Sequence, residues 1–145
     1  QAGGNVTLNG VIRANGEAVN DSFCAGGAGG AIYIACGTFL GGGSSRLEAR
    51  GGDHLNPNYD GSGGGGGGGR IAIWENTPQS MIDRVAAGET PTGLVTSNQS
   101  PRFTGTLSVT NGTQFLPTIY GTGADPGTCL FCSYEVGAAV LIQFR

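Results

Sequence analysis

The chain uses one phrase twice, as GGAGGAIYIAC at residues 26–36 and as GGGGGGGRIAIW at residues 63–74. In both copies a run of glycines leads directly into a short segment with the alternation of a β-strand. A catalytic glycine loop has no reason to recur with its flanks, whereas a phrase that recurs in order is typical of a repeat protein. The doubled phrase therefore predicts a repeat architecture.

The flanks of the phrase recur as well, since IRANG (12–16) precedes the first glycine run and LEARG (47–51) precedes the second. The offset is 35 residues between the upstream pieces and 39 between the downstream pieces. A weaker third copy follows as GTLSVTNG (105–112) and GTCLFC (127–132). Low-complexity glycine is the competing interpretation, but the matched positions include residues other than glycine.

Composition limits the class of protein. The 145 residues are enough for one domain with a core, and residues 1–145 are expected to form a single unit with an insertion at about 75–102. Thirty glycines accompany only six prolines and show no strict three-residue period, which excludes collagen. The regularly placed Ile, Val, Tyr, Phe and Leu argue against a flexible linker.

Charge and hydropathy exclude two kinds of partner. The net charge is −3, all seven basic residues are arginines, and no basic patch is visible, so no nucleic-acid partner is expected. No apolar run approaches the roughly 20 residues of a membrane span, and no signal peptide is visible. The chain starts beside a repeat and ends in an apolar run, so we expect a processed piece or a subunit of a longer assembly.

Alternation and turn residues predict seven strands and one helix. The strands are expected at residues 5–14, 31–36, 44–50, 70–74, 105–110, 128–136 and 138–144. The helix is expected at 77–88, with Thr77 as N-cap, Pro78 at the first helical position and Gly88 as terminator.

The order of the copies favours one β architecture over a sandwich or a barrel. In a right-handed parallel β-helix, a β-solenoid, equivalent phrases lie above one another in chain order. We therefore expect Ile32 beside Ile71 and Ile34 beside Ile73, all facing inward. The glycines would allow positive φ or close backbone approach in a thin wall. Coils of about 20 to 25 residues would give about six coils.

Four cysteines are an even number, which predicts two disulfides in an oxidising compartment. Three pairings are open among Cys24, Cys36, Cys129 and Cys132. The last two form a CxxC, for which half a zinc site or a redox pair is the alternative.

N-glycosylation is indicated by four acceptor sequons. They begin at Asn5, Asn20, Asn98 and Asn111. An Asn- and Thr-rich surface whose sequons are unused is the alternative.

These features together resemble the glycine-rich repeats of large secreted and cell-surface proteins of microbes and protists. The resemblance rests on a strand ending in ANG or ARGG, a polar loop, a glycine run and then AIYI or RIAI. It covers about residues 5–74 well and the remainder loosely. It implies a parallel β-helix of the pectate-lyase-like type and a location at the cell surface, with little implication for chemistry.

The sequence predicts neither an enzyme nor a cofactor. Polysaccharide lyases and hydrolases occur on parallel β-helices, but the GHG and RIK phrases are absent and the acidic residues are scattered. The single His54 is expected to be a solvated loop residue rather than a general base. The same loop carries a weak calcium alternative at Asn56, Asn58 and Asp60, where an Asx-rich turn is the simpler interpretation.

Two function classes remain. The first is an extracellular structural protein, a glycosylated β-helical module that stacks with copies of itself into a surface filament or stalk. The second is an adhesin or carbohydrate-binding module that uses outward-facing Tyr33, Tyr59 and Trp74 as stacking platforms for sugars.

Overall fold

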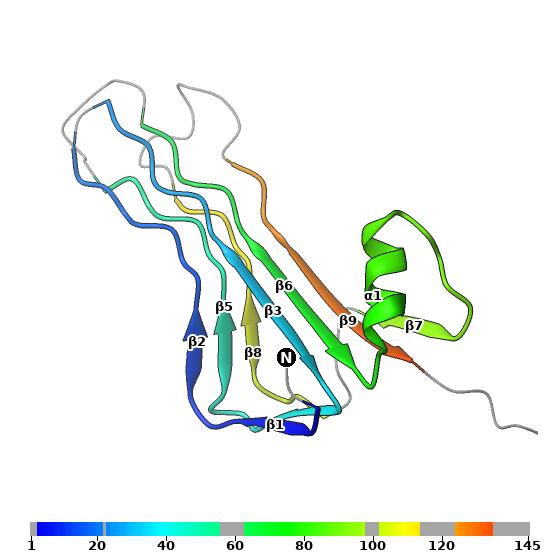
Figure 1. Cartoon of the computed structure of the whole chain (residues 1–145). Helices are drawn as coiled ribbons and strands as arrows, with labels where there is room; N and C mark the ends of the chain where they lie inside the picture. Colours follow the sequence, from blue (N-terminus) through cyan, green and yellow to red (C-terminus); the bar gives the residue numbers. More distant parts are fainter. Residues whose placement is uncertain (1–2, 22, 56–62, 98–101, 114–123, 135–145) are drawn as a thin grey trace, which may run out of the picture.

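The structure is a computed structural model that describes residues 3–21, 23–55, 63–97, 102–113 and 124–134. This part of the chain is mostly β, with one short helix (Figure 1). Its strands are β1 (Asn5–Leu8), β2 (Val11–Arg13), β3 (Ala31–Cys36), β4 (Thr38–Gly41), β5 (Arg46–Glu48), β6 (Arg70–Glu75), β7 (Leu94–Ser97), β8 (Thr106–Ser108) and β9 (Thr128–Tyr134). The helix α1 spans Gln79–Ala86.

The strands form three sheets, with orders β1-β4, β2-β5-β8 and β3-β6-β9-β7. All pairs are parallel except β7 with β9. The chain visits the sheets in the same order each time, so its strands fall into three layers. Layer 1 is β1, β2 and β3; layer 2 is β4, β5 and β6; layer 3 is β8 and β9, preceded by a parallel bridge from Phe103 to Gly41. Figure 1 shows equivalent strands side by side.

The register confirms the sequence repeat. Ile12 pairs with Leu47, an offset of 35 residues, and Ala31 pairs with Arg70, an offset of 39. The third copy is confirmed too, because β8 pairs with β5 and β9 pairs with β6.

The predicted isoleucine pairs are also confirmed. Ile32 lies opposite Ile71, and Ile34 lies opposite Ile73. In layer 3 the same two columns continue with Cys129 and Phe131. Ile71 and Ile73 are almost fully buried, since each has a neighbour above and below it. These columns form the core together with Phe39, Leu47, Ala49 and Phe103.

The expected coil length was wrong. Equivalent strands lie 33 to 39 residues apart in the first two layers, so the described residues make three layers rather than about six. The extra length lies between the second and third strands of each layer. There the chain runs out and back as two extended glycine-rich segments, 14–19 with 26–30 in layer 1 and 49–54 with 63–69 in layer 2.

The glycine segments bond in two directions. The amides of Gly26 and Gly29 donate to layer 2, at Gly64 and Gly67, whereas those of Gly27 and Gly30 donate across to residues 17 and 14 of the same layer. The direction of the N–H groups recurs every third residue, which matches a polyproline II helix with three residues per turn. The outgoing and returning segments of each layer are therefore joined by backbone hydrogen bonds, with no side-chain core between them.

Close approach, and not positive φ, explains these glycines. A Cβ at Gly66 would lie 1.9 Å from the carbonyl oxygen of Gly27, and one at Gly52 would lie 1.9 Å from that of Glu17. Within the described residues only Gly88 and Gly93 among the glycines have positive φ, and both lie outside the runs. The expected role in a thin wall is confirmed, and the expected role in positive φ is wrong.

Some of the predicted strand and helix bounds agree with the structure and others do not. The segment 5–14 divides into β1 and β2, and β4 and β7 were not predicted. The helix is shorter than 77–88, and it begins after Pro78, which is the N-cap rather than the first helical residue. Thr77 makes no cap, because its hydroxyl donates to the carbonyl oxygen of Glu75 at 2.9 Å. Gly88, with φ of +86°, ends the helical turn as expected. The segment 138–144 lies outside the described residues.

Candidate functional site

The acidic side chains are used within the fold. Glu48 accepts a hydrogen bond from Arg13 Nε at 2.8 Å, and this contact holds the pKa of the carboxyl below its ordinary value. Asp53 Oδ1 accepts from the backbone N–H and the hydroxyl of Thr113, at 2.6 and 2.9 Å, which lowers its pKa. Each bond joins one layer to another, so these groups stabilise the stack.

Glu75 is the buried carboxylate of the described residues, with a relative exposure of 6%. Its Oε1 accepts the backbone N–H of Phe39 at 2.7 Å, and Arg102 Nη1 lies 4.0 Å away. It also lies opposite Cys36 in the ladder. Burial, and secondly this negative charge, raise the pKa of the Cys36 thiol. A thiol held protonated is a poor nucleophile, so the pair does not form an activated cysteine.

His54 is not solvated, contrary to expectation. It is 5% exposed and forms a parallel bridge with Val19, and its Nε2 lies 3.3 Å from the carbonyl oxygen of Asp21. Residue 54 belongs to the layered wall rather than to a free loop, because its backbone N–H donates to Thr113 in layer 3. Its ring thus contacts a backbone carbonyl group.

The two expected disulfides are wrong, because all four cysteines are free thiols. The register explains this for three of them. Cys36 shares a column with Ser133, two layers away, which corresponds to about 9.6 Å. Cys132 is one residue from that column and Cys129 is four, whereas a disulfide needs Cα atoms within about 7 Å. Cys24 is exposed beside the first glycine run.

The CxxC alternatives are contradicted as well. Cys129 and Cys132 are three residues apart on one strand, so their side chains point to opposite faces. Cys129 packs against the core, whereas Cys132 packs with Trp74 and Ile82 on the other face. The two sulfurs can neither pair nor bind one metal ion. No metal-binding group of three His, Cys, Asp or Glu occurs in the residues described.

The three aromatic residues predicted to stack on sugars differ in their exposure. Tyr33 faces outward as expected and is 50% exposed. Burial, and secondly the negative charge of Asp83 on α1, raise the pKa of its hydroxyl. Trp74 also points out of the sheet, but it is only 5% exposed, because Ile82 of α1 and Leu94 of β7 cover it. Trp74 is therefore unavailable to a sugar. Tyr59 lies outside the described residues.

The sequons differ in accessibility. Asn5 and Asn20 are exposed. Asn111 is half-buried, and its Nδ2 donates to the carbonyl oxygen of Gly112 at 3.3 Å. Asn98 lies outside the described residues, as do the three residues of the calcium alternative, Asn56, Asn58 and Asp60.

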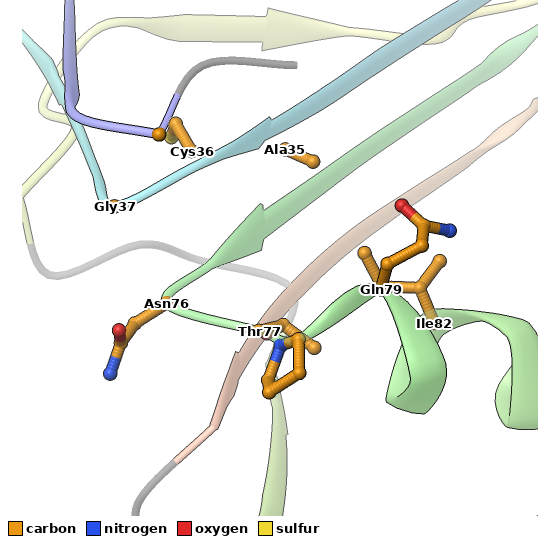
Figure 2. Close-up of a pocket in the computed structure, with 9 residues that line it drawn as sticks. Ala35, Cys36, Gly37, Asn76, Thr77, Gln79 and Ile82 are labelled. Carbon is orange, nitrogen blue, oxygen red and sulfur yellow. The ribbon is translucent and has the colours of Figure 1, made fainter.

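A shallow pocket of about 350 Å³ lies between the end of β3 and the start of α1. Figure 2 shows Cys36 and Gly37 on one side and Asn76, Thr77 and Gln79 on the other. The polar side chains are already bonded within the protein: Asn76 Nδ2 donates to Tyr134 and Gln79 Nε2 donates to Asp83. The pocket therefore offers no convergent set of polar groups to a ligand.

The open end of layer 1 is the strongest candidate site. Ile12 is 36% exposed, although its neighbour in the column, Leu47, is fully buried. Val11 beside it is 42% exposed, and no part of β2 is buried. β1, β2 and β3 each pair on one edge only within the described residues. This end, which we call the layer-1 edge, therefore combines three strand edges that are unpaired among the described residues with one uncovered side chain of a core column, Ile12.

Comparison with family models, with curated proteins and with solved structures found no match. The resemblance to glycine-rich surface repeats therefore stays a prediction. No helix in the residues described is long and apolar enough to cross a membrane.

Proposed function

We propose that this chain is an extracellular structural protein, a right-handed parallel β-helical module that stacks end to end with copies of itself into a surface filament or stalk. The observation that carries the proposal is the contrast between Ile12 and Leu47. The two residues hold equivalent places in adjacent layers, and only the one at the end of the stack is exposed.

The topology supports the β-helix. The chain returns to the same three sheets in the same order, and equivalent strands pair in parallel. Connections between parallel strands of one sheet are right-handed in about 98% of cases, which supports the handedness.

The strand edges support self-association. Unpaired edges offer rows of N–H and C=O groups that pair with another chain unless they are covered. The column of Ile12 and Leu47 ends in layer 3 at Leu107, which is half-buried. Both ends of this column are thus incompletely covered, and a layer 3 placed on a layer-1 edge would bring Leu107 beside Ile12.

An extracellular location is supported by the two exposed sequons at Asn5 and Asn20. The free thiols give no support for an oxidising compartment, so the location rests on the sequons and on the resemblance described above.

A second candidate function, an adhesin or carbohydrate-binding module, has the support of Tyr33. Its half-exposed ring stands close enough to Asp83 for the carboxylate to influence its hydroxyl, and a ring beside a carboxylate is a usable sugar platform. Binding to a glycan array that is lost in Tyr33→Ala would favour this function, whereas silence on the array would count against it.

The structural proposal is tested by sedimentation over a range of concentrations, with electron microscopy of the same samples. Wild-type protein is expected to form end-to-end assemblies, and Ile12→Glu is expected to remain monomeric because it places a charge on the layer-1 edge. Leu55→Glu is the matched control, since Leu55 is 50% exposed but lies in layer 2. Assembly of Ile12→Glu at the wild-type level would contradict the proposal.

A further inference from the structure

β7 occupies the position on β9 that the next layer would take. The third sheet runs β3-β6-β9 in parallel, and β7 then adds to the outer edge of β9 in the antiparallel direction. Figure 1 shows β7 next to β9 and below α1. A second copy cannot add its β3 to the whole edge of β9 while β7 is there.

β7 covers only half of that edge. Its register runs from Leu94 opposite Tyr134 to Ser97 opposite Phe131. Residues 128–130 of β9 have no partner on that side among the described residues. The incomplete cover is visible at Cys129, which is half-buried, whereas Ile71, the preceding member of its column, is 1% exposed.

β7 is also held by few side chains. Leu94 is half-buried in the cluster of Trp74 and Ile82, but the other three residues of the strand are exposed, Val95 at 46%. Opposite Phe131 it places Ser97, a polar residue at the end of an apolar column. The docked strand therefore closes the sheet without continuing the core.

β3 of a second copy fits the same place better. In the register of the existing layers, its Ile32 would lie beside Cys129 and its Ile34 beside Phe131. It would add six paired residues to the edge of β9, whereas β7 supplies four. These contacts repeat those already made within the stack.

From these observations we infer that β7 is a displaceable cap. The β3 strand of a second copy pairs first with residues 128–130, which β7 leaves open, and then replaces β7 along residues 131–133. This inference rests on the self-association proposed above, and it adds a control step: the chain assembles only when β7 leaves β9.

A designed disulfide tests the inference. Thr96 lies directly opposite Cys132. Opposite residues of an antiparallel pair have Cα atoms about 4.5 to 5.5 Å apart, a separation that a disulfide spans. Thr96→Cys should therefore lock β7 onto β9 when oxidised. Burial raises the pKa of Cys132 to about 11, so a thiol oxidant is added. All variants carry Cys24→Ser, because Cys24 is exposed and could link two chains.

Light scattering measures assembly. We expect oxidised Thr96→Cys to lose assembly and to regain it on reduction. Thr96→Ser is the matched control and should assemble in both conditions. Thiol counting and intact mass verify the lock. Equal assembly of the locked and reduced forms would overturn the cap while leaving self-association intact.

Two further measurements test whether β7 is displaced on assembly. Leu94→Ser, which removes the half-buried side chain of β7, should assemble faster than wild type. If neither wild type nor Leu94→Ser assembles at any concentration, both the proposed self-association and the proposed cap are contradicted. Hydrogen exchange of residues 95–97 should become faster on assembly; unchanged protection would contradict displacement even if the lock cannot be formed.

Discussion

At the residue scale, the glycines divide by what surrounds them. At Gly16, Gly51 and Gly66 a Cβ would lie 1.9 Å from a carbonyl oxygen of a neighbouring segment. At Gly64, two residues before Gly66, nothing lies within 4 Å. One glycine run therefore holds positions that tolerate no side chain and positions that tolerate one.

We predict that Gly66→Ala destabilises the protein by about 3 kcal/mol or more, because the clash is with backbone that cannot rotate away. Gly64→Ala should change stability little, or raise it by up to about 1 kcal/mol through the unfolded state. Denaturant unfolding of the two variants measures the difference. Equal stabilities would show that the walls are not in contact as described.

Asp53 makes stability depend on pH. Its pKa is lowered from an ordinary 3.8 because the folded state supplies two hydrogen bonds from Thr113. Its contribution is therefore present above the unfolded pKa and is lost as pH falls through the folded pKa. We expect Asp53→Ala to be less stable than wild type at neutral pH, and the gap to narrow progressively as the pH falls below about 4 and through the lowered folded pKa. A gap that persists at lower pH would rule out the ionised carboxylate as its source.

At the element scale, alternation predicted the long strands well. AIYIAC and RIAIW each place two isoleucines on one face, and the structure has both strands and their register. β4 and β7 were missed because their short segments, TFLG and LVTS, carry no glycine run and little alternation. Trp74 was assigned correctly to the outer face. Its burial depends on α1 and β7, which come later in the chain, so alternation within β6 could not show it.

The position of a strand in the stack should decide the cost of truncating its core residue. Leu47→Ala should cost about 2 to 5 kcal/mol, because Leu47 is fully buried between two layers. Ile12→Ala should cost about 1 kcal/mol in the monomer, because Ile12 has a neighbour on one side only. Chemical denaturation at a concentration below assembly tests this, and a larger loss for Ile12 would contradict the layer order.

The cover over Trp74 can be followed by fluorescence, since the chain has one tryptophan. Ile82→Asp puts a charge into the cluster of Trp74, Ile82 and Cys132, so α1 should detach and the emission should move to longer wavelength. Ser80→Asp, on an exposed position of the same helix, should leave the emission unchanged. An unshifted spectrum for Ile82→Asp would mean that α1 does not shield the indole.

At the scale of the whole molecule, the repeat was predictable and the number of layers was not. The recurrence of whole phrases indicated parallel stacking because only stacking requires equivalent residues to recur in order. Counting layers requires the path of the glycine segments, which follows from hydrogen bonds between residues far apart in sequence, such as Gly66 to Gly52 and Gly112 to Gly66.

The candidate site was predictable in kind but not in detail. The sequence indicated stacking between copies of the chain, yet the even number of cysteines indicated disulfides that the register forbids. An even number of cysteines says nothing about their distances, whereas a disulfide requires the two cysteines to lie in adjacent columns and layers. Cys36 and Cys129 lie four positions and two layers apart. The cap also could not be predicted, since β7 is recognisable only by its place on β9.

The central claim is that layers continue from one molecule into the next. High-resolution electron cryomicroscopy of the assembled protein tests it most directly. We predict β3 of one subunit at strand spacing, about 4.8 Å, from β9 of its neighbour, with Ile34 beside Phe131 and β7 displaced. Isolated monomers at every concentration, or subunits that touch only through their side walls, would contradict it.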